Sequence, residues 1–269
     1  MMRIVLFFLS FFFAVTVFAQ ENILSTNPLA EQILLGNYDP ADYQASTLIN
    51  DPASIAQGIA SGILPDSLRA YLFRLSAFRT RNTGADTLSP TEGMGAARNW
   101  VFEKFEEFSA QREQRLVTSF LQFDQEVCGM GRHKNIFTVL PGMDKSDPSI
   151  IIVQAHIDSR CEGPCDVDCL AEGSEDNGSG TALVIELARV MSQFSFDHTI
   201  VFMATTGEEQ GLFGATAFAQ YAVDNGISIK AVFNNDTVGG IICGETSSPP
   251  SCPGLNHWKT NAPAYCLCD

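Results

Sequence analysis

The sequence predicts an α/β fold in which helices cover both faces of a sheet. Strand-length apolar runs alternate with helix-length segments from residue 117 onward, which is the pattern of an α/β sheet. Residues 150–155 form an apolar run, as expected for a strand buried on both faces. The length of 269 residues and the 45% share of hydrophobic residues suit a globular protein with a sizeable core. Because the carboxyl ends of the strands line the ligand crevice in such sheets, we expect the functional site there.

The remaining elements are predicted from capping residues and periodicity. Residues 20–65 are expected to form an N-terminal helical extension, because Asp39-Pro40 and Asp51-Pro52 each place a capping side chain before a proline at the first helical position. Apolar residues at helical spacing predict helices over 67–78 and 90–108. Beyond these we expect strands over 117–127, 135–140, 150–155, 199–205 and 231–235, and helices over 178–194 and 209–224.

Residues 1–19 have the features of a secretory signal peptide. Met1-Met2-Arg3 precedes the apolar run 4–18, and the small residue Ala19 follows it. An uncleaved membrane anchor is the alternative, but a membrane span needs about 20 apolar residues. We therefore expect an exported protein, periplasmic or extracellular, without stable membrane insertion after the signal is cleaved.

Cysteine content and net charge agree with export and exclude polyanionic partners. The eight cysteines can pair in an oxidising compartment, and the sequence leaves their pairing open. A thiolate metal site is the alternative for Cys161, Cys165 and Cys169, although their spacing is not that of a CxxC motif. The formal net charge of −15 argues against nucleic acid or an anionic membrane surface as a partner. The oligomeric state stays open.

Two polar clusters lie on either side of a cysteine-rich loop that we expect a disulfide to brace. His156 and Asp158 follow the run 150–155, and Asp158 can turn back to accept the second N–H of the imidazole. A structural histidine is the alternative. Asp176 opens the motif Asp176-Asn177-Gly178-Ser179-Gly180 before a helix, where small residues allow a sharp turn and a helix N-terminus favours anions. A simple helix cap is the alternative there.

Two further clusters follow the strands at 199–205 and 231–235. Glu208 and Glu209 are expected to begin a helix, so that one side chain can bind a metal while its neighbour reaches a water. Compensation of the helix dipole is the alternative for this pair. Asp236 follows the last strand, where it could instead form a turn. Taken together, the four clusters supply zinc ligands and one carboxylate left over as a base.

These residues, in this order, resemble the co-catalytic zinc exopeptidases, a family that includes secreted bacterial aminopeptidases, glutamate carboxypeptidases and the transferrin-receptor ectodomain. The resemblance is dense over residues 134–240 and thinner back to residue 68. It implies a mixed, mostly parallel sheet flanked by helices. It also implies two zinc ions: His156, Asp176 and Asp236 would hold one, and Glu209 would hold the other together with Asp176, which bridges the two.

The resemblance further implies a mechanism and a class of substrate. A hydroxide bridging the metals would attack a peptide carbonyl, with Glu208 as general base and Asp158 orienting His156. The substrates would be peptides, and aminopeptidase activity is the commonest among the secreted members. Carboxypeptidases and glutaminyl cyclases share much of the scaffold, so the specificity stays open.

The chain departs from the family pattern after Asp236. The family supplies a final histidine ligand well beyond this position, but only 33 residues follow Asp236 here, and His257 lies close for such a ligand. We expect residues 66–254 to form an incomplete catalytic domain and residues 255–269 an off-pattern tail, as in a truncated reading frame. His133 and His198 precede strands and are expected on the surface, at the opposite end of the sheet.

Two classes of function follow. The first is an exported zinc-dependent aminopeptidase, and the alternative is an inactive remnant or a non-catalytic binding protein on the same scaffold. Retention of Glu208 together with every available ligand favours the enzyme, because a scaffold without catalysis has no chemical need of them.

Overall fold

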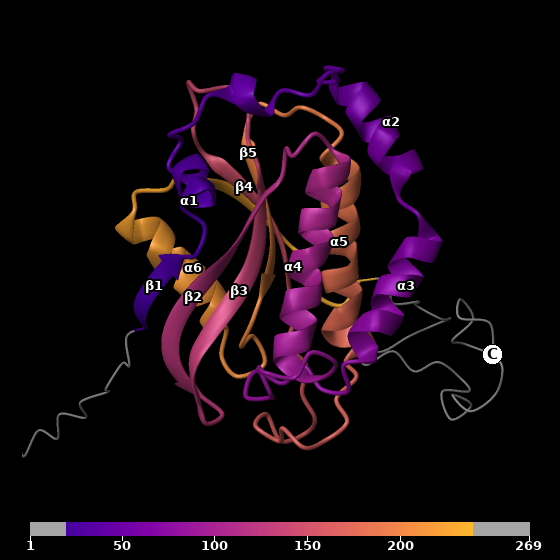
Figure 1. Cartoon of the computed structure of the whole chain (residues 1–269), viewed down its shortest axis with the longest axis vertical. Coiled ribbons are helices and arrows are strands. Elements are labelled where there is room, and N and C mark those ends of the chain that lie inside the picture. Colours follow the sequence, from indigo (N-terminus) through magenta and orange to yellow (C-terminus); the bar gives the residue numbers. More distant parts are fainter. Residues whose placement is uncertain (1–19, 239–269) are drawn as a thin grey trace, which may run out of the picture.

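A computed structural model describes residues 20–238, in which a six-stranded sheet lies between layers of helices (Figure 1). The strand order across the sheet is β1-β2-β3-β5-β4-β6. The signal segment 1–19, the tail 255–269 and His257 lie outside the described residues. The strands are β1 (Glu21–Ser25), β2 (Val117–Val127), β3 (Met130–Leu140), β4 (Ile150–His156), β5 (Thr199–Thr205) and β6 (Ile229–Asn234).

The sheet is mixed, which confirms the predicted α/β class. β4 pairs in parallel with β5 and with β6, whereas β1–β2, β2–β3 and β3–β5 are antiparallel. The expectation of a mostly parallel sheet is therefore not met within residues 20–238. The reason is local: Cys128 and Gly129 both have positive φ and turn β2 directly back into β3 as a hairpin. The parallel part, β5-β4-β6, places three carboxyl strand ends side by side.

Helices cover both faces of the sheet, and each face has its own apolar core. Side chains such as Phe105, Ile185 and Phe202 fill one core, and Leu121, Phe137 and Val201 belong to the other. Figure 1 shows α4 and α5 on one face and α1 and α6 on the other. The helices are α1 (Pro28–Leu34), α2 (Pro52–Gly62), α3 (Pro65–Ser76), α4 (Gly93–Gln111), α5 (Gly180–Met191) and α6 (Phe213–Asp224), with short η1 (Pro40–Tyr43) and η2 (Ser174–Ser179).

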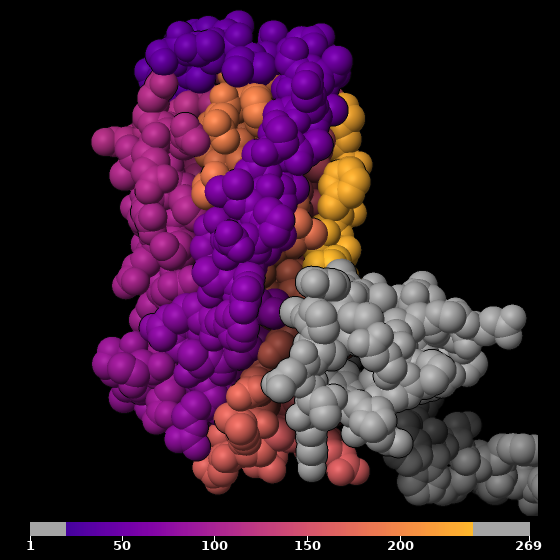
Figure 2. Space-filling model, turned by 90° about the vertical axis from the view of Figure 1, so that its right-hand side faces the viewer, coloured from indigo at the N-terminus to yellow at the C-terminus, as the bar shows by residue number. Residues whose placement is uncertain are grey.

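The N-terminal segment contains the two capped helical turns that the sequence predicts. The carboxylates of Asp39 and Asp51 accept hydrogen bonds from the backbone N–H groups of Ala41 and Ser54, at the starts of η1 and α2. Figure 2 shows α2 and α3 lying across one face of the molecule. This segment is not only helical, however, because β1 joins the sheet by pairing with β2. Five residues without clear alternation gave no signal for that strand.

Three local expectations are corrected. The last helix begins at Phe213 rather than at Glu209, because Gly207, Gly211 and Leu212 have positive φ and keep the chain non-helical until that point. His133 is buried inside β3, with its Nε2 3.0 Å from the carbonyl oxygens of both Gln125 and Met130. It also lies toward the carboxyl end of β5 and not at the opposite end of the sheet, because β3 runs antiparallel to β5. His198 precedes β5 at the end of the sheet opposite the predicted site, as expected, but its side chain is partly buried.

Two disulfides close the loops near the carboxyl ends of the strands. Cys128 pairs with Cys165, and Cys161 pairs with Cys169, so the cysteine-rich loop is braced as predicted. The thiolate metal site is excluded for Cys161, Cys165 and Cys169, since all three are disulfide-bonded. The other four cysteines lie outside the described range. Among the helices within residues 20–238, none is long and apolar enough to cross a bilayer.

Candidate metal centre

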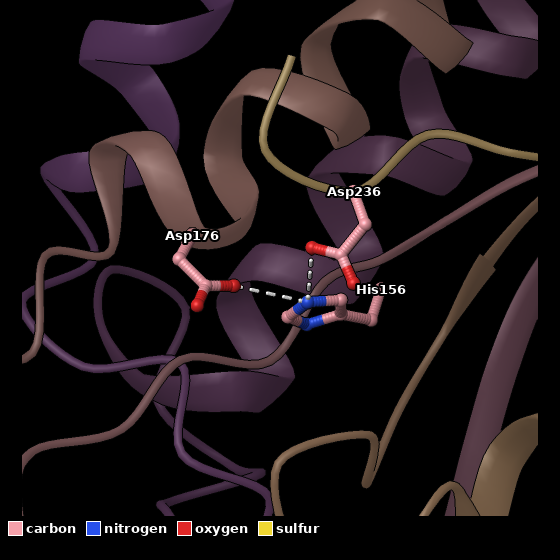
Figure 3. Close-up of side chains that lie close together, drawn as sticks. All are labelled: His156, Asp176 and Asp236. Carbon is pink, nitrogen blue, oxygen red and sulfur yellow. Dashed lines mark ion pairs between the residues drawn. The ribbon is translucent and has the colours of Figure 1, made fainter. Parts of the chain in front are cut away.

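Three of the predicted ligands converge at the carboxyl ends of the parallel strands. The Nε2 atom of His156 lies 3.1 Å from Oδ1 of Asp176 and 3.4 Å from Oδ1 of Asp236 (Figure 3). His156 ends β4, Asp236 follows the neighbouring strand β6, and Asp176 comes from η2 before α5. The parallel pairing of β4 with β6 is thus what brings residues 80 positions apart to one point.

The geometry of this cluster fits a tetrahedral zinc ion. Zinc binds nitrogen and oxygen ligands at about 2.0–2.2 Å, so neighbouring ligand atoms on a tetrahedron lie about 3.3 Å apart. The two distances from His156 fall near that value, and one ligand atom from each of the three residues lies within 4.8 Å of the others. The imidazole is buried, whereas the carboxylates of Asp176 and Asp236 are 56% and 40% exposed, so the cluster opens to solvent on one side.

The second nitrogen of His156 is held by Asp158, though chiefly through its backbone. Nδ1 lies 3.1 Å from the carbonyl oxygen of Asp158 and 3.6 Å from its carboxylate. A carbonyl oxygen can only accept, so Nδ1 carries a proton, and Nε2 is the nitrogen that faces the carboxylates and could bind a metal once its own proton leaves. The expected orientation of the imidazole by Asp158 is present, but the carbonyl, not the carboxylate, makes the shorter contact.

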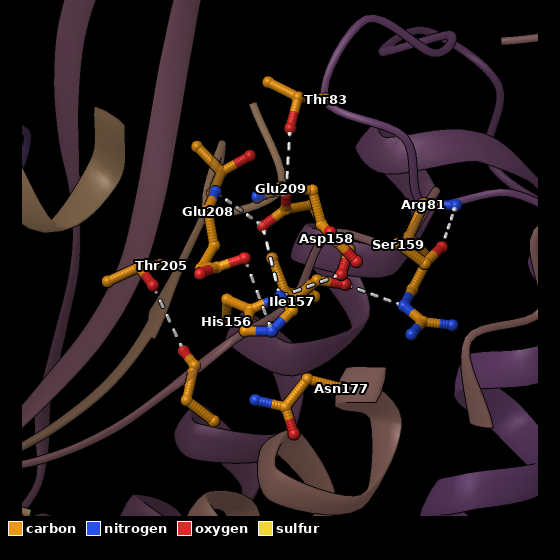
Figure 4. Close-up of polar contacts among 12 residues, drawn as sticks. Arg81, Thr83, His156, Ile157, Asp158, Ser159, Asn177, Thr205, Glu208 and Glu209 are labelled. Atoms are coloured by element: carbon orange, nitrogen blue, oxygen red, sulfur yellow. Dashed lines mark hydrogen bonds and ion pairs between the residues drawn. The ribbon is translucent and has the colours of Figure 1, made fainter. Parts of the chain in front are cut away.

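The carboxylate of Asp158 holds the loop that carries the two glutamates. Its oxygens accept hydrogen bonds from the backbone N–H groups of Glu208, at 3.2 Å, and Glu209, at 3.1 Å (Figure 4). The hydroxyl of Thr83 donates a third bond, at 3.3 Å, to this fully buried side chain. Sequence patterns did not single out Thr83, because nothing in a turn 75 residues away signals contact with Asp158.

Glu208 faces the cluster from the loop after β5. Its carboxylate lies 3.9 Å from Nε2 of His156. Burial raises the pKa of Glu208, and the negative charges of Asp158, Glu209 and Asp236 raise it further, against the opposing effect of His156. A base whose pKa is raised toward neutrality is suited to taking and returning a proton.

The carboxylates around His156 also set the pKa of its imidazole. Burial lowers it, but the hydrogen bond and charge of Asp158, joined by the charges of Glu208 and Asp236, raise the pKa to about 9. The imidazole without a metal is therefore protonated at neutral pH. The negative charges of the surrounding carboxylates stabilise a positive charge at this position, and in the metal-free protein a proton on the imidazole supplies it.

Glu209 does not join the converging set. Its carboxylate accepts a hydrogen bond from Nε of Arg160 at 2.6 Å, and both residues line an open hollow of about 480 Å³ beside Asp176. Glu209 and Asp176 thus line the same hollow, but Glu209 does not belong to the group of converging ligand atoms. The carboxylate of Glu209 is instead paired with Arg160, a residue that the sequence did not single out.

The Asp176-to-Gly180 motif fastens the segment that carries Asp236. The side-chain oxygen of Asn177 accepts from the N–H groups of Gly180 and Thr237, and its amide donates to the carbonyl of Asn235 at 2.9 Å. A Cβ atom at Gly180 would lie 2.0 Å from that same carbonyl oxygen. Only glycine permits this approach, so the motif places Asp176 and anchors Asp236 at once.

A histidine with two carboxylates at the strand ends of an α/β sheet defines a candidate metallohydrolase. Residues 135–241 match the model of Peptidase family M28, so this part of the chain is a peptidase family M28 domain. The match covers Asp158, Glu208 and all four predicted ligands. Recognition of the co-catalytic zinc exopeptidases from the sequence is thereby confirmed.

Similar proteins with assigned names agree with this family. A probable zinc metalloprotease of Pyrenophora teres f. teres is 35% identical over 193 residues, which cover 70% of this chain and 42% of that protein. Aminopeptidase YwaD of Bacillus subtilis is 34% identical over 119 residues, covering 44% of this chain and 22% of its own. The crystal structure of Legionella pneumophila LapA superimposes with a TM-score of 0.57 at 25% identity, over 72% of this chain and 48% of that one. The chain spans less than half the length of the first curated relatives that it matches.

Proposed function

We propose that this chain belongs to an exported zinc aminopeptidase that removes N-terminal residues from peptides. One observation carries the proposal: Nε2 of His156 meets the carboxylates of Asp176 and Asp236 at tetrahedral spacing, with Glu208 beside them. The names of the relatives, zinc metalloprotease and aminopeptidase, support the metal and the reaction. The charge of the chain is against a nucleic-acid partner.

His156, Asp176 and Asp236 would hold the first zinc ion. A second zinc would take Asp176 as the shared ligand and Glu209 once it leaves Arg160. Within residues 20–238, no additional His, Cys, Asp or Glu completes that second set. Zinc, when bound, supplies Lewis acidity toward the scissile carbonyl.

The residues of this chain then have distinct tasks. Asp158 keeps the imidazole of His156 in one tautomer and holds the Glu208–Glu209 loop by its backbone. Glu208 takes a proton from the attacking water and returns it to the leaving amine. The side chain of Glu208 is 31% exposed, so it can reach a substrate that enters from solvent. An open hollow beside Asp176 offers room for the end of a peptide chain.

A zinc titration combined with hydrolysis of aminoacyl-p-nitroanilides tests the proposal. Purified protein should bind zinc, and hydrolysis should require the metal and disappear in the Glu208→Gln variant. Zinc binding without hydrolysis of any aminoacyl substrate would refute the aminopeptidase assignment and favour a binding protein or inactive form. Failure to bind zinc would refute the metal site itself.

Export is tested separately. If residues 1–19 are a cleaved signal, the protein recovered outside the cytoplasm should begin at Gln20 on N-terminal sequencing. Retention of Met1 in the recovered protein would contradict this part of the proposal.

A further inference from the structure

Arg81 is a fully buried arginine that binds backbone carbonyl groups instead of an acidic side chain. Its Nε donates to the carbonyl of Ile157 at 2.7 Å, and Nη1 donates to those of Leu75 and Glu172 at 3.1 and 2.5 Å. Nη2 donates to the carbonyl of Gly173 at 2.9 Å. Burying a charge without a contacting counter-ion is costly, so four carbonyl contacts at one point indicate a specific task.

Three of the four carbonyl groups bound by Arg81 belong to the two loops that carry metal ligands, and the fourth, that of Leu75, lies in α3. Ile157 lies between His156 and Asp158, at the exit of β4. Glu172 and Gly173 lead into η2, which carries Asp176. Figure 4 shows the guanidinium of Arg81 beside this exit from β4. One planar side chain therefore joins loops that approach the metal site from separate elements.

The second loop is joined to Arg81 in a way that fixes Asp176. The carbonyl of Gly173 also accepts from the N–H of Gly178 at 2.9 Å, which closes the turn around Asp176. Gly173 has a φ of +48°, and a Cβ atom there would lie 2.9 Å from Nη2 of Arg81 and 2.5 Å from Cβ of Ser159. The backbone thus approaches the guanidinium as closely as a glycine allows.

Ser159 makes a second tie between the same segments. Its hydroxyl accepts from the backbone N–H of Arg81 at 3.1 Å and donates to the carbonyl of Ala171 at 2.7 Å. The N–H of Ser159 donates to the carbonyl of Arg81. The guanidinium is therefore held in one place relative to both loops.

We propose that Arg81 is a positioning residue for the metal site, which sets the separation of His156 and Asp176 by binding the carbonyls of Ile157, Glu172 and Gly173. The inference rests on the proposed zinc site. The three nitrogen atoms of a guanidinium can donate to both loops at once, whereas the single ammonium nitrogen of a lysine can reach only one of them. Without the arginine, the two ligands are no longer held at zinc spacing before the metal arrives.

The chain contains a matched control at the opposite end of the sheet. Arg115 is also buried and also binds carbonyl groups, with contacts of 2.8 Å to Tyr43, 2.6 Å to Ser192 and 2.9 Å to Phe194. It precedes β2 at the end where β5 begins, away from the metal ligands. Its loss should cost folding stability without altering the zinc site.

The test compares zinc affinity in Arg81→Met, Arg81→Lys and Arg115→Met, measured by competition with a chromophoric chelator, alongside the melting temperature. Loss of a group that orients metal ligands lowers affinity about 10- to 100-fold, and we expect this for both Arg81 variants. Arg115→Met should bind zinc like the unaltered protein even where it melts earlier. The visible spectrum of bound Co²⁺ should change in Arg81→Lys and stay unchanged in Arg115→Met.

The outcomes separate this inference from the proposed function. If the unaltered protein binds zinc and both Arg81 variants bind it equally well, the positioning role is refuted alone. If Arg115→Met loses as much affinity as Arg81→Lys, the effect is general destabilisation and the inference is likewise refuted. If the unaltered protein binds no zinc, the proposed function falls and the inference with it. Should Arg81→Met not fold, Arg81→Lys still decides between these results.

Discussion

The two ends of the central sheet each place a histidine beside carboxylates, but only one end balances the charge. At the end where the parallel strands begin, His198 lies 3.8 Å from Asp147, whose carboxylate also pairs with Lys230 at 3.2 Å. At the carboxyl end, His156 meets the acids Asp176, Asp236 and Glu208, and none of the three has a lysine or arginine within ion-pair distance in the described part of the chain. Excess negative charge around one imidazole favours an added cation, which supports the proposed metal site at the carboxyl end.

The pKa values express the same difference. Hydrogen bonds from Ser149, with one from Lys230, lower the pKa of Asp147 to about 2, so this carboxylate is already satisfied. Burial lowers the pKa of His156, but the hydrogen bond and charge of Asp158, with the charges of Glu208 and Asp236, raise it to about 9. A metal bound at the carboxyl end would replace the proton on His156, whereas the carboxylate of Asp147 already has donors and a lysine beside it.

The largest effect on catalysis should come from Glu208. Glu208→Gln removes the general base, and turnover of an aminoacyl-p-nitroanilide should fall about 10²- to 10⁴-fold. Zinc affinity should stay near that of the unaltered protein, because Glu208 is not among the proposed ligands. The same change at the other end of the sheet, Asp147→Asn, should leave turnover unaltered. Equal losses in both variants would contradict a specific role for the carboxyl end.

The next effect concerns Asp158. In Asp158→Asn the side-chain amide offers one acceptor where the carboxylate has two, so an N–H group of the Glu208–Glu209 loop loses its partner. Zinc affinity should fall about 10- to 100-fold, and turnover should fall with it. Chelator competition measures the first quantity and steady-state hydrolysis the second. An unchanged affinity would show that the loop keeps its place without Asp158.

The pH dependence of zinc binding should follow His156. Below its pKa of about 9 the imidazole of the metal-free protein carries a proton that zinc must displace. Affinity should therefore rise as pH rises, by about tenfold per unit near neutrality from this group. Competition titrations at pH 6.5 and pH 7.5, corrected for the chelator, measure the slope. His198→Ala should keep it, and a flat profile would place the proton elsewhere.

The smallest effect is expected for Arg160. The side chain of Arg160 is exposed, and solvent screens its ion pair with Glu209, so the pair is weak. Arg160→Ala releases Glu209, so the weaker of two zinc ions should bind up to about fivefold more tightly. Calorimetry resolves the two steps. Weaker binding in this variant would show that Arg160 supports the site instead of competing with it.

The sequence predicted the convergence of His156, Asp176 and Asp236 better than the conformation of the loops around them. His156 and Asp236 could be placed because parallel strand ends meet at one edge, and Asp176 because its motif permits a sharp turn. The helix expected over 209–224 is present, but its start was placed four residues early, because the positive φ angles of Gly207 and Leu212 follow from tertiary contacts and not from local preferences. Arginine is mostly exposed in proteins, so the turn around Arg81 gave no sign that its guanidinium is buried between two ligand loops.

The most direct test of the whole account is zinc binding by the unaltered protein, His156→Ala and His198→Ala, measured side by side by equilibrium dialysis with metal analysis. The account predicts that the unaltered protein and His198→Ala retain zinc equally, and that His156→Ala retains none at the same free zinc concentration. Equal retention by His156→Ala and the unaltered protein would contradict it, because the carboxyl end of the sheet would then not be the metal site.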